Sequence, residues 1–196
     1  MVLATGNAGK LREMQAILAD HGLEVVPQSE FGIRPPVEDG DSYVANALIK
    51  ARNAAFVTGL PAIADDSGLE VDALGGRPGI HAARYSGPDV DAEVNNDKLL
   101  AELAGTPEAN RGARFRCAMV FVRDAADASP IVAEGAWEGR IGLERRGRGG
   151  FGYDPLFVVA GTGVTVAEMP EAEKNRISHR GQALAALAEK MKAAGW

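Results

Sequence analysis

Two adjacent carboxylates follow a short apolar run in the segment PAIADDSGLEV, residues 61–71. If the apolar run is a buried strand, Asp65 and Asp66 leave its end on opposite faces, because side chains alternate along a strand. One carboxylate could then face a cleft while the other binds nearby backbone amides. With Glu38, these acids supply the hard oxygen ligands that Mg²⁺ prefers. A purely structural alternative is that the D-x-S-G stretch is a turn.

A glycine-containing loop, TGNAGK at residues 5–10, lies between a predicted strand and a predicted helix. Backbone N–H groups and the helix dipole favour an anion at such a position. The loop is not a Walker A motif, because Ala4 and Leu11 stand where that motif needs Gly and Ser or Thr. It also fails the G-x-G-x-x-G pattern, since only Gly6 and Gly9 are present. Phosphate binding and a simple tight turn both remain open for this loop.

Aromatic and basic side chains occur together near the end of the chain. The stretch FGYDP, residues 151–155, places aromatic rings beside glycine, where a ring could stack on a planar base or simply pack in the core. EKNRISHRGQAL, residues 173–184, gathers basic side chains at the predicted start of the last helix, namely Lys174, Arg176, His179 and Arg180. These cations oppose the helix dipole, so an anionic ligand would relieve the cost; a solvated basic face is the alternative.

Composition restricts the class of protein. With 196 residues, 46% hydrophobic and 24% charged, the chain is typical of one soluble domain, with room for two lobes. The net charge of −6 argues against broad binding of nucleic acid, which needs many basic side chains. Apolar runs are too short for a membrane span and the start lacks a signal pattern, so we expect a cytoplasmic protein without a membrane partner. Cys117 lies among apolar residues and is predicted to be a core residue.

Hydrophobic periodicity predicts the elements that must position these residues. The predicted strands are residues 2–4, 23–27, 61–64, 69–74, 114–122, 130–141 and 156–159. The predicted helices are residues 11–22, 42–59, 91–103 and 178–194, and Ser178 is a candidate cap for the last one. Early alternation of strands and helices, followed by a hairpin, predicts an α/β domain with a mixed sheet.

Five segments together resemble the inosine/xanthosine triphosphate pyrophosphatases, a family that removes deaminated purine nucleotides. The segments are ATGNAGK (4–10), VANALIKAR (44–52), IADDSGLEVDALGGRPGIHAARYSG (63–87), GGFGYDPLF (149–157) and ISHRGQAL (177–184). They follow the family's order over nearly the whole chain. The one departure is VANA, where bacterial relatives often have an ENA sequence.

This resemblance implies an elongated mixed sheet with flanking helices, forming two lobes around a nucleotide-binding cleft. Residues 1–196 would be a single two-lobed domain, usually present as a homodimer. The implied reaction is the Mg²⁺-dependent hydrolysis of ITP, dITP or XTP to the nucleoside monophosphate and pyrophosphate. The ranking of these substrates, the preference for ribose or deoxyribose, and the means of excluding GTP stay open.

The resemblance also implies roles for particular residues. The phosphates would be held by Thr5, Gly6, Asn7, Ala8, Gly9 and Lys10. The metal would be held by Glu38 and Asp66, and Asp66 would also accept a proton from the attacking water. The nucleotide would be contacted by Ser67, Phe151, Gly152, Tyr153, Asp154, Lys174, His179 and Arg180. Whether Asp65 or Asp66 is the main metal ligand is left open.

Charge and hydrogen bonding agree with these roles. A triphosphate carries about four negative charges, and its hydrolysis is accelerated mainly by positioning and charge neutralisation, which Lys10, Lys174 and Mg²⁺ would supply. A donor from His179 or Arg180 to the 6-oxygen of the base would be left unpaired by adenine, at a cost of ~1–3 kcal/mol. Two other functions are considered: a nucleotide-sensing module without chemistry, and a phosphotransferase, which the missing Walker A motif disfavours.

Overall fold

Three long strands, β3 (Ala62–Val71), β5 (Gly112–Val122) and β6 (Ile131–Ile141), belong to a mixed seven-stranded sheet in the computed structural model, which describes residues 1–88 and 91–196. Neighbouring strands follow the order β2-β1-β3-β5-β6-β7, and β4 pairs with β3. The chain divides into two compact units. Unit 1 comprises Met1–Asp66, Cys117–Gly135 and Ser178–Trp196, and unit 2 comprises Ser67–Arg116 and Ala136–Ile177. The three long strands contribute residues to both units.

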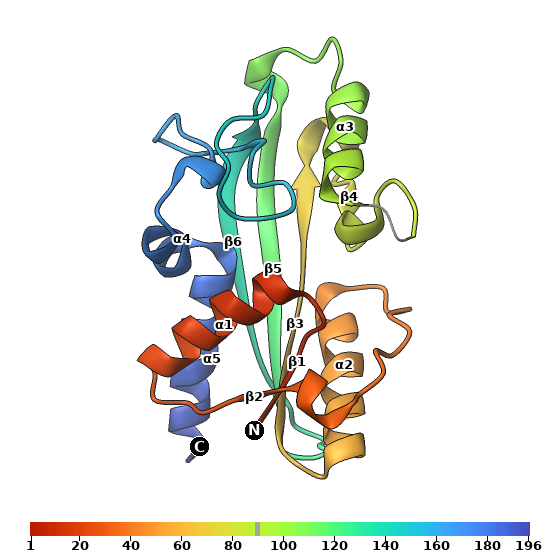
Figure 1. Cartoon of the computed structure of the whole chain (residues 1–196), viewed down its shortest axis with the longest axis vertical. Coiled ribbons are helices and arrows are strands. Elements are labelled where there is room, and N and C mark those ends of the chain that lie inside the picture. Colours follow the sequence, from red (N-terminus) through yellow and green to blue (C-terminus); the bar gives the residue numbers. More distant parts are fainter. Residues whose placement is uncertain (89–90) are drawn as a thin grey trace. The chain divides into compact units, whose positions relative to one another are not determined.

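Unit 1 contains the short strands β1 (Val2–Ala4) and β2 (Val26–Pro27) and three helices, α1 (Ala8–Asp20), α2 (Tyr43–Thr58) and α5 (His179–Ala193). Strand β1 is parallel to both β2 and β3. Figure 1 shows α1 and α5 together on one side of these strands and α2 on the other. A parallel sheet covered on both faces is the expected arrangement for strands that are apolar at successive positions.

Alternation along the strands divides the core of unit 1 into two layers. Leu3 and Ile63 pack with the apolar faces of α1 and α5. Val2, Ala62 and Ala64 pack on the opposite side, against the alanine-rich face of α2. The two-residue period therefore decides which helix each strand residue meets.

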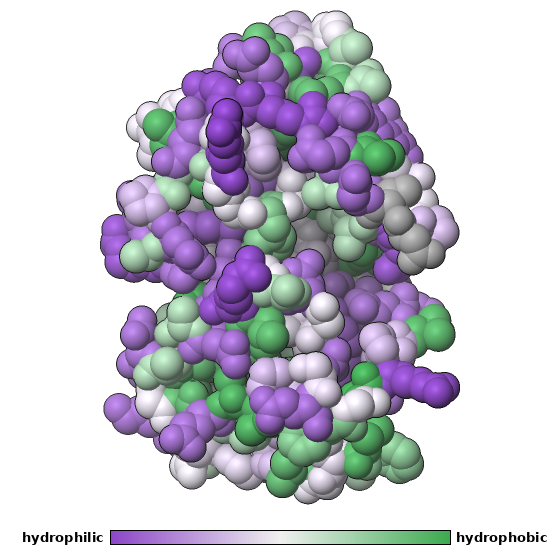
Figure 2. Space-filling model, viewed as in Figure 1, coloured by the Kyte–Doolittle hydropathy of each residue, from purple (hydrophilic) through white to green (hydrophobic). Residues whose placement is uncertain are grey.

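The helices of unit 1 begin and end at the residues that their local chemistry favours. Asn7, Ser42 and Ser178 each accept a hydrogen bond from a backbone amide of the first turn, as N-cap residues do. Helix α2 ends at Gly59, which adopts a left-handed conformation with φ of 67°. Beside that end, Phe56 and Val57 are exposed, and Figure 2 shows apolar side chains gathered where α2 ends.

Unit 2 is built around helix α3 (Ala92–Glu102), the short strands β4 (Pro78–Gly79) and β7 (Phe157–Val159), and helix α4 (Glu171–Ile177). Its core is one apolar cluster that includes Leu69, Leu99 and the aromatic side chains of Phe115, Trp137 and Phe157. Strand β7 pairs in antiparallel fashion with β6. Among the described residues, no helix has the length and hydrophobicity needed to span a membrane.

Three predicted strands differ in the structure. The predicted strands 61–64 and 69–74 are one strand, β3, which continues through Asp65, Asp66 and Ser67, so the alternative of a D-x-S-G turn is excluded. This strand ends at Val71, and Asp72–Leu74 form a 3-10 helix instead of continuing it. Each carboxylate meets a cation on its own face of the strand, Lys10 for Asp65 and Lys50 for Asp66, so the cost of burying the two charges is offset. The predicted strand 23–27 is reduced to β2, Val26–Pro27.

The basic stretch 173–184 does not form a single helix start. Helix α4 ends at Ile177, and Ser178 then caps α5. Lys174 consequently belongs to unit 2, whereas His179 and Arg180 belong to unit 1. Cys117 is buried as predicted, and burial raises the pKa of its thiol to about 12, which makes it an unreactive core residue.

Candidate active site

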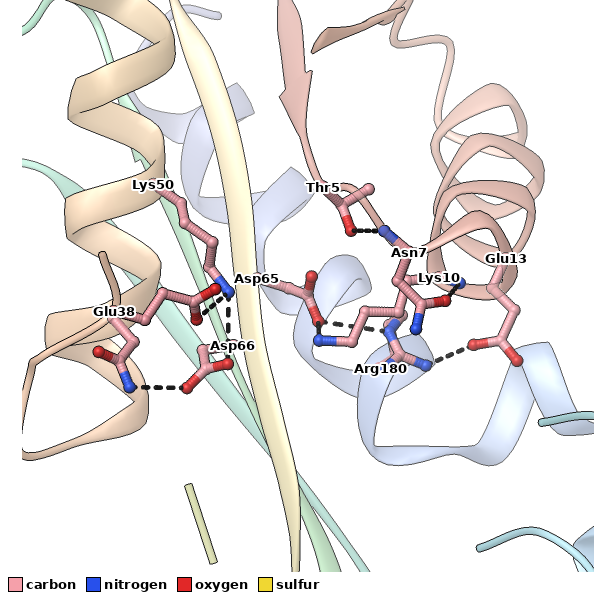
Figure 3. Close-up of polar contacts among 10 residues, drawn as sticks. Thr5, Asn7, Lys10, Glu13, Glu38, Lys50, Asp65, Asp66 and Arg180 are labelled. Carbon is pink, nitrogen blue, oxygen red and sulfur yellow. Dashed lines mark hydrogen bonds and ion pairs between the residues drawn. The ribbon is translucent and has the colours of Figure 1, made fainter. Parts of the chain in front are cut away.

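The paired carboxylates lie on opposite faces of β3, as the strand period predicts. Asp65 lies on the same face of the strand as Ile63 and points toward α1 and α5. Asp66 lies on the same face as Ala64 and points toward α2. Figure 3 shows the two side chains leaving the strand toward different groups of partners. Each carboxylate therefore has a separate electrostatic environment.

Asp66 is held by two side chains of α2. The ammonium group of Lys50 lies 3.3 Å from Asp66 Oδ1 and donates to Glu38 Oε2 at 2.9 Å. The amide of Asn46 donates from Nδ2 to Asp66 Oδ2 at 3.2 Å. Asn46 and Lys50 are one helical turn apart, so they project from the same face of α2. Glu38, Lys50 and Asp66 consequently form one charged cluster (Figure 3).

Burial and charge set the pKa values of this cluster. Burial raises the pKa of Asp66, and the nearby Lys50 and Lys10 only partly oppose that effect. Burial alone would lower the pKa of Lys50, but Asp65, Asp66 and Glu38 outweigh it, so the pKa of Lys50 is raised. Asp66 is therefore more basic than an ordinary carboxylate, and Lys50 remains charged.

The donor set on this face fits a hard divalent cation. The carboxylates of Glu38 and Asp66 converge on the ammonium of Lys50, so both already face one positive charge. Among the described residues, no group of three or more His, Cys, Asp or Glu side chains could enclose a metal ion. Mg²⁺ is commonly bound by one or two carboxylates plus water and phosphate oxygens, so two carboxylates suffice.

Asp65 belongs to a buried ion cluster on the other face. Lys10 Nζ lies 2.8 Å from Asp65 Oδ2, and Arg180 Nε lies 3.6 Å from the same oxygen. Arg180 also pairs with Glu13 of α1. Burial would raise the pKa of Asp65, but Lys10 and Arg180 outweigh it and hold that pKa well below its usual range. Asp65 is consequently a permanently ionised partner for two cations.

The predicted phosphate loop leads directly into α1. Gly6, Asn7 and Ala8 are exposed at the start of the helix. Asn7 Oδ1 accepts from the backbone amide of Lys10 at 3.0 Å, and Thr5 Oγ1 accepts from the amide of Asn7 at 3.3 Å. The loop thus presents an accessible helix N-terminus of the kind that binds anions. Its side-chain cation, on Lys10, is paired with Asp65.

The candidate nucleotide-binding residues of unit 2 form a second group. Lys174 Nζ lies 2.6 Å from Asp154 Oδ2 and 4.6 Å from the centre of the Phe151 ring. The amide of Phe151 donates to the same carboxylate oxygen at 2.9 Å, so Asp154 connects the ring-bearing loop to Lys174. Phe151 is half-buried, which leaves part of its ring accessible.

Gly152 and Tyr153 support this loop. The hydroxyl of Tyr153 donates to the carbonyl of Ala82 at 2.8 Å, and its ring is buried in the core of unit 2. Tyr153 therefore packs rather than stacks. Gly152 has a φ of 62° and its carbonyl accepts from Asn96 at 3.1 Å. Of the remaining candidates, Ser67 is half-buried next to Asp66, and His179 is buried at the start of α5.

The chain and its fold are similar to those of known proteins. The sequence model of the Ham1 family matches residues 1–190. This chain belongs to the Ham1 family. The dITP/XTP pyrophosphatase of Methylococcus capsulatus is 61% identical over 193 residues, which cover 98% of this chain and 96% of that protein. The dITP/XTP pyrophosphatase of Escherichia coli O157:H7 is 53% identical over 192 residues, which cover 98% of each chain.

Solved Ham1-family structures have the same fold. The HAM1 protein of Coxiella burnetii superposes with a TM-score of 0.89 at 44% identity and covers 98% of both chains. A nucleoside-triphosphatase / dITP/XTP pyrophosphatase of Mycobacterium abscessus gives a TM-score of 0.75 at 43% identity, covering 95% of this chain and 96% of its own. The predicted family and the predicted α/β fold class are therefore confirmed.

Three residues of the two charged clusters are not among the residues that the sequence predicted: Asn46, Lys50 and Glu13. The helical spacing of residues 42–59 places Asn46 and Lys50 on one face, but that spacing does not show that the face meets Asp66. Glu13 gave no signal, because its partner Arg180 is 167 positions away in the sequence. Only the fold of unit 1 identifies that pair.

Proposed function

We propose that the protein is a nucleoside triphosphate pyrophosphatase for deaminated purine nucleotides. It hydrolyses ITP, dITP or XTP to the nucleoside monophosphate and pyrophosphate, which keeps these bases out of DNA and RNA. The observation that carries the proposal is the buried carboxylate of Asp66, which lies beside Lys50 and Glu38. Asp66 is the last residue of the first segment of unit 1. The names of the relatives supply the substrate class.

The chemistry assigned to Asp66 is proton transfer. Water attacks the α-phosphorus, the bond from that phosphorus to the bridging α–β oxygen breaks, and pyrophosphate leaves. Asp66 accepts the proton of the attacking water, because it is the buried carboxylate that lies beside Lys50 and Glu38 on this face of the strand. Lys50 remains charged beside it and can stabilise the negative charge that develops on the phosphoryl oxygens.

We assign Mg²⁺ to Glu38 and Asp66. When bound, it would neutralise phosphate charge, which is the main demand of phosphoryl transfer. Residues 5–10 are assigned to the phosphates, because they offer accessible amides at the N-terminus of α1 and the ammonium of Lys10. The polyphosphate competes there with Asp65 for Lys10.

The nucleoside is assigned to the residues for which the family resemblance implies nucleotide contact. Phe151 offers a partly accessible ring, and Lys174 lies over that ring and pairs with Asp154. Gly152 belongs to the same loop, and Ser67 follows Asp66 in β3. His179 and Arg180 are assigned to the purine 6-oxygen, and Tyr153 supports the loop by packing. We also infer a homodimer, which the family resemblance supports, and a cytoplasmic location, which the short apolar runs of the sequence support.

Product identification tests this function. Purified protein incubated with ITP and Mg²⁺ is expected to release IMP and pyrophosphate, and Asp66→Asn is expected to lower turnover by about 10²–10⁴-fold, because the general base is removed. Urea unfolding of the variant controls for loss of the fold. Release of IDP and orthophosphate contradicts the assigned bond, and ITP binding without turnover indicates a nucleotide sensor. Transfer of labelled phosphate to an acceptor other than water indicates a phosphotransferase.

A further inference from the structure

Asn46 is a buried polar residue that connects two segments of the candidate site. Its side chain is 1% exposed and lies in the first turns of α2. Nδ2 donates to Asp66 Oδ2 at 3.2 Å, and Oδ1 accepts from the backbone amide of Gly40 at 2.9 Å. One amide therefore links strand β3 to the loop that carries Glu38.

The two oxygens of Asp66 have different partners from the same helix. Asn46 holds Oδ2, and Lys50, one turn later, holds Oδ1. Rotation of the carboxylate about its last bond would break one contact or the other. The amide of Asn46 contacts one carboxylate oxygen and the ammonium of Lys50 contacts the other, so α2 determines the orientation of the carboxylate. Figure 3 shows the contact with Lys50.

Gly40 lets the loop approach Asn46 closely. A Cβ atom at this position would lie 2.8 Å from Asn46 Oδ1 and 2.8 Å from Ala45 Cβ, closer than such contacts allow. The backbone amide of Gly40 can therefore reach the side chain of Asn46 only because residue 40 has no side chain. Two residues earlier, Glu38 pairs with Lys50 at 2.9 Å, so α2 holds both carboxylates of the cluster.

We infer that Asn46 is a positioning residue for the hydrolytic reaction, which holds the carboxylate of Asp66 and the Glu38 loop in one arrangement. The inference rests on the proposed function. Asn46 acts through Asp66 and the loop rather than on the substrate. Removal of a side chain that orients a metal-binding group in this way typically lowers activity or metal affinity by about 10–100-fold.

Two variants of Asn46 separate its two hydrogen bonds. Asn46→Ala removes both, whereas Asn46→Asp keeps an acceptor for Gly40 and loses the donor to Asp66. Asn53→Ala is the matched control, because Asn53 lies on the same helix and donates to the carbonyl of Arg34 at 3.2 Å, away from Asp66. For each protein, kcat and KM for ITP are measured at saturating Mg²⁺, with urea unfolding as the stability measurement.

The expected result is a fall in kcat for both Asn46 variants, by about 10-fold or more, while KM changes much less. Asn53→Ala is expected to retain the wild-type kcat. Hydrogen exchange of the Gly40 amide, measured without metal or nucleotide, should accelerate in Asn46→Ala and stay slow in Asn46→Asp. A merely structural role would lower the stability of Asn46→Ala without this division between kcat and KM.

A kcat for Asn46→Ala within about twofold of that for Asn53→Ala would overturn the inference, as would unchanged turnover in Asn46→Asp. If Asn46→Ala does not fold, Asn46→Asp decides the question by itself, because it preserves shape and the contact with Gly40. Absence of ITP hydrolysis by the wild-type protein refutes the proposed function instead. In that case the exchange rate of the Gly40 amide still tests whether Asn46 holds the loop.

Discussion

At the scale of residues, the neighbouring aspartates Asp65 and Asp66 have different electrostatic environments, because different cations face them. Asp65 meets Lys10 and Arg180, whereas Asp66 meets Lys50 and shares it with Glu38. We take Asp66 as the better candidate for the metal, because it shares the ammonium of Lys50 with Glu38, whereas Asp65 pairs with Lys10 and with the buried Arg180, which Glu13 also contacts. Burial of both carboxylates is tolerated because each has a charged partner close by.

Asp65→Asn is expected to destabilise the protein at neutral pH. The variant leaves Lys10 and Arg180 without their shared carboxylate, and breaking a buried ion pair typically costs about 3–5 kcal/mol. The pKa of Asp65 is depressed in the folded state, so its contribution is present above the unfolded pKa of about 3.9 and is lost as pH falls toward the folded pKa.

Urea unfolding of both proteins, from pH 7 down to about 3, measures this effect. The difference in unfolding free energy should be largest near neutral pH and should shrink once the unfolded chain begins to bind the proton. A difference that stays constant over the whole range would show that Asp65 contributes by packing and not by charge.

At the scale of elements, strand β6 and helix α5 are packed without an intervening side chain at Gly135. A Cβ atom there would lie 2.1 Å from the carbonyl oxygen of His179 and 2.9 Å from the amide nitrogen of Ala183. All three residues belong to unit 1. The position of the α5 N-terminus, and with it the positions of His179 and Arg180, therefore depends on a glycine in the strand.

Gly135→Ala is expected to destabilise the protein by about 1–3 kcal/mol or more, because the new methyl group meets backbone atoms that cannot rotate away. It should also raise KM for ITP if α5 contributes to nucleotide binding. The matched control is Gly142→Ala, where the nearest atoms to a new Cβ lie 3.4 Å away. Equal stabilities of the two variants in thermal unfolding would exclude close packing at Gly135.

At the scale of the whole molecule, an acidic protein is proposed to bind a polyanion. The net charge is −6 and hydrophilic side chains cover much of the face in Figure 2, so long-range attraction does not favour the triphosphate. Local cations must compensate, yet Lys10, Lys50 and Lys174 are each paired with a carboxylate. A divalent metal held by Glu38 and Asp66 would neutralise the two carboxylates that pair with Lys50 and so free that ammonium group for the phosphates.

Metal removal should therefore abolish most of the stabilisation by nucleotide. With Mg²⁺, an ITP analogue that cannot be cleaved between the α- and β-phosphates should stabilise the fold by about 2.7 kcal/mol at a concentration of about 100 Kd. For a chain of this length, that corresponds to a rise in Tm of about 5–10 °C. Thermal unfolding with Mg²⁺ and with EDTA measures the change, and an equal rise in EDTA would contradict the metal assignment.

The amino-acid sequence determined the features that depend on local order. The alternation through PAIADD put Asp65 and Asp66 on opposite faces, the cap residue Ser178 marked the start of the last helix, and the order of motifs identified the family. These properties depend on neighbours along the chain and on the period of each element, which a sequence displays directly.

The tertiary structure alone decided which charges meet. It assigned Lys50 and Asn46 to Asp66, Lys10 and Arg180 to Asp65, and Glu13 to Arg180. It also showed that β3 continues through the acidic pair instead of turning. Ion pairing acts across space and is indifferent to separation along the chain, so the partners of a buried carboxylate become known only when the helices are packed on the sheet.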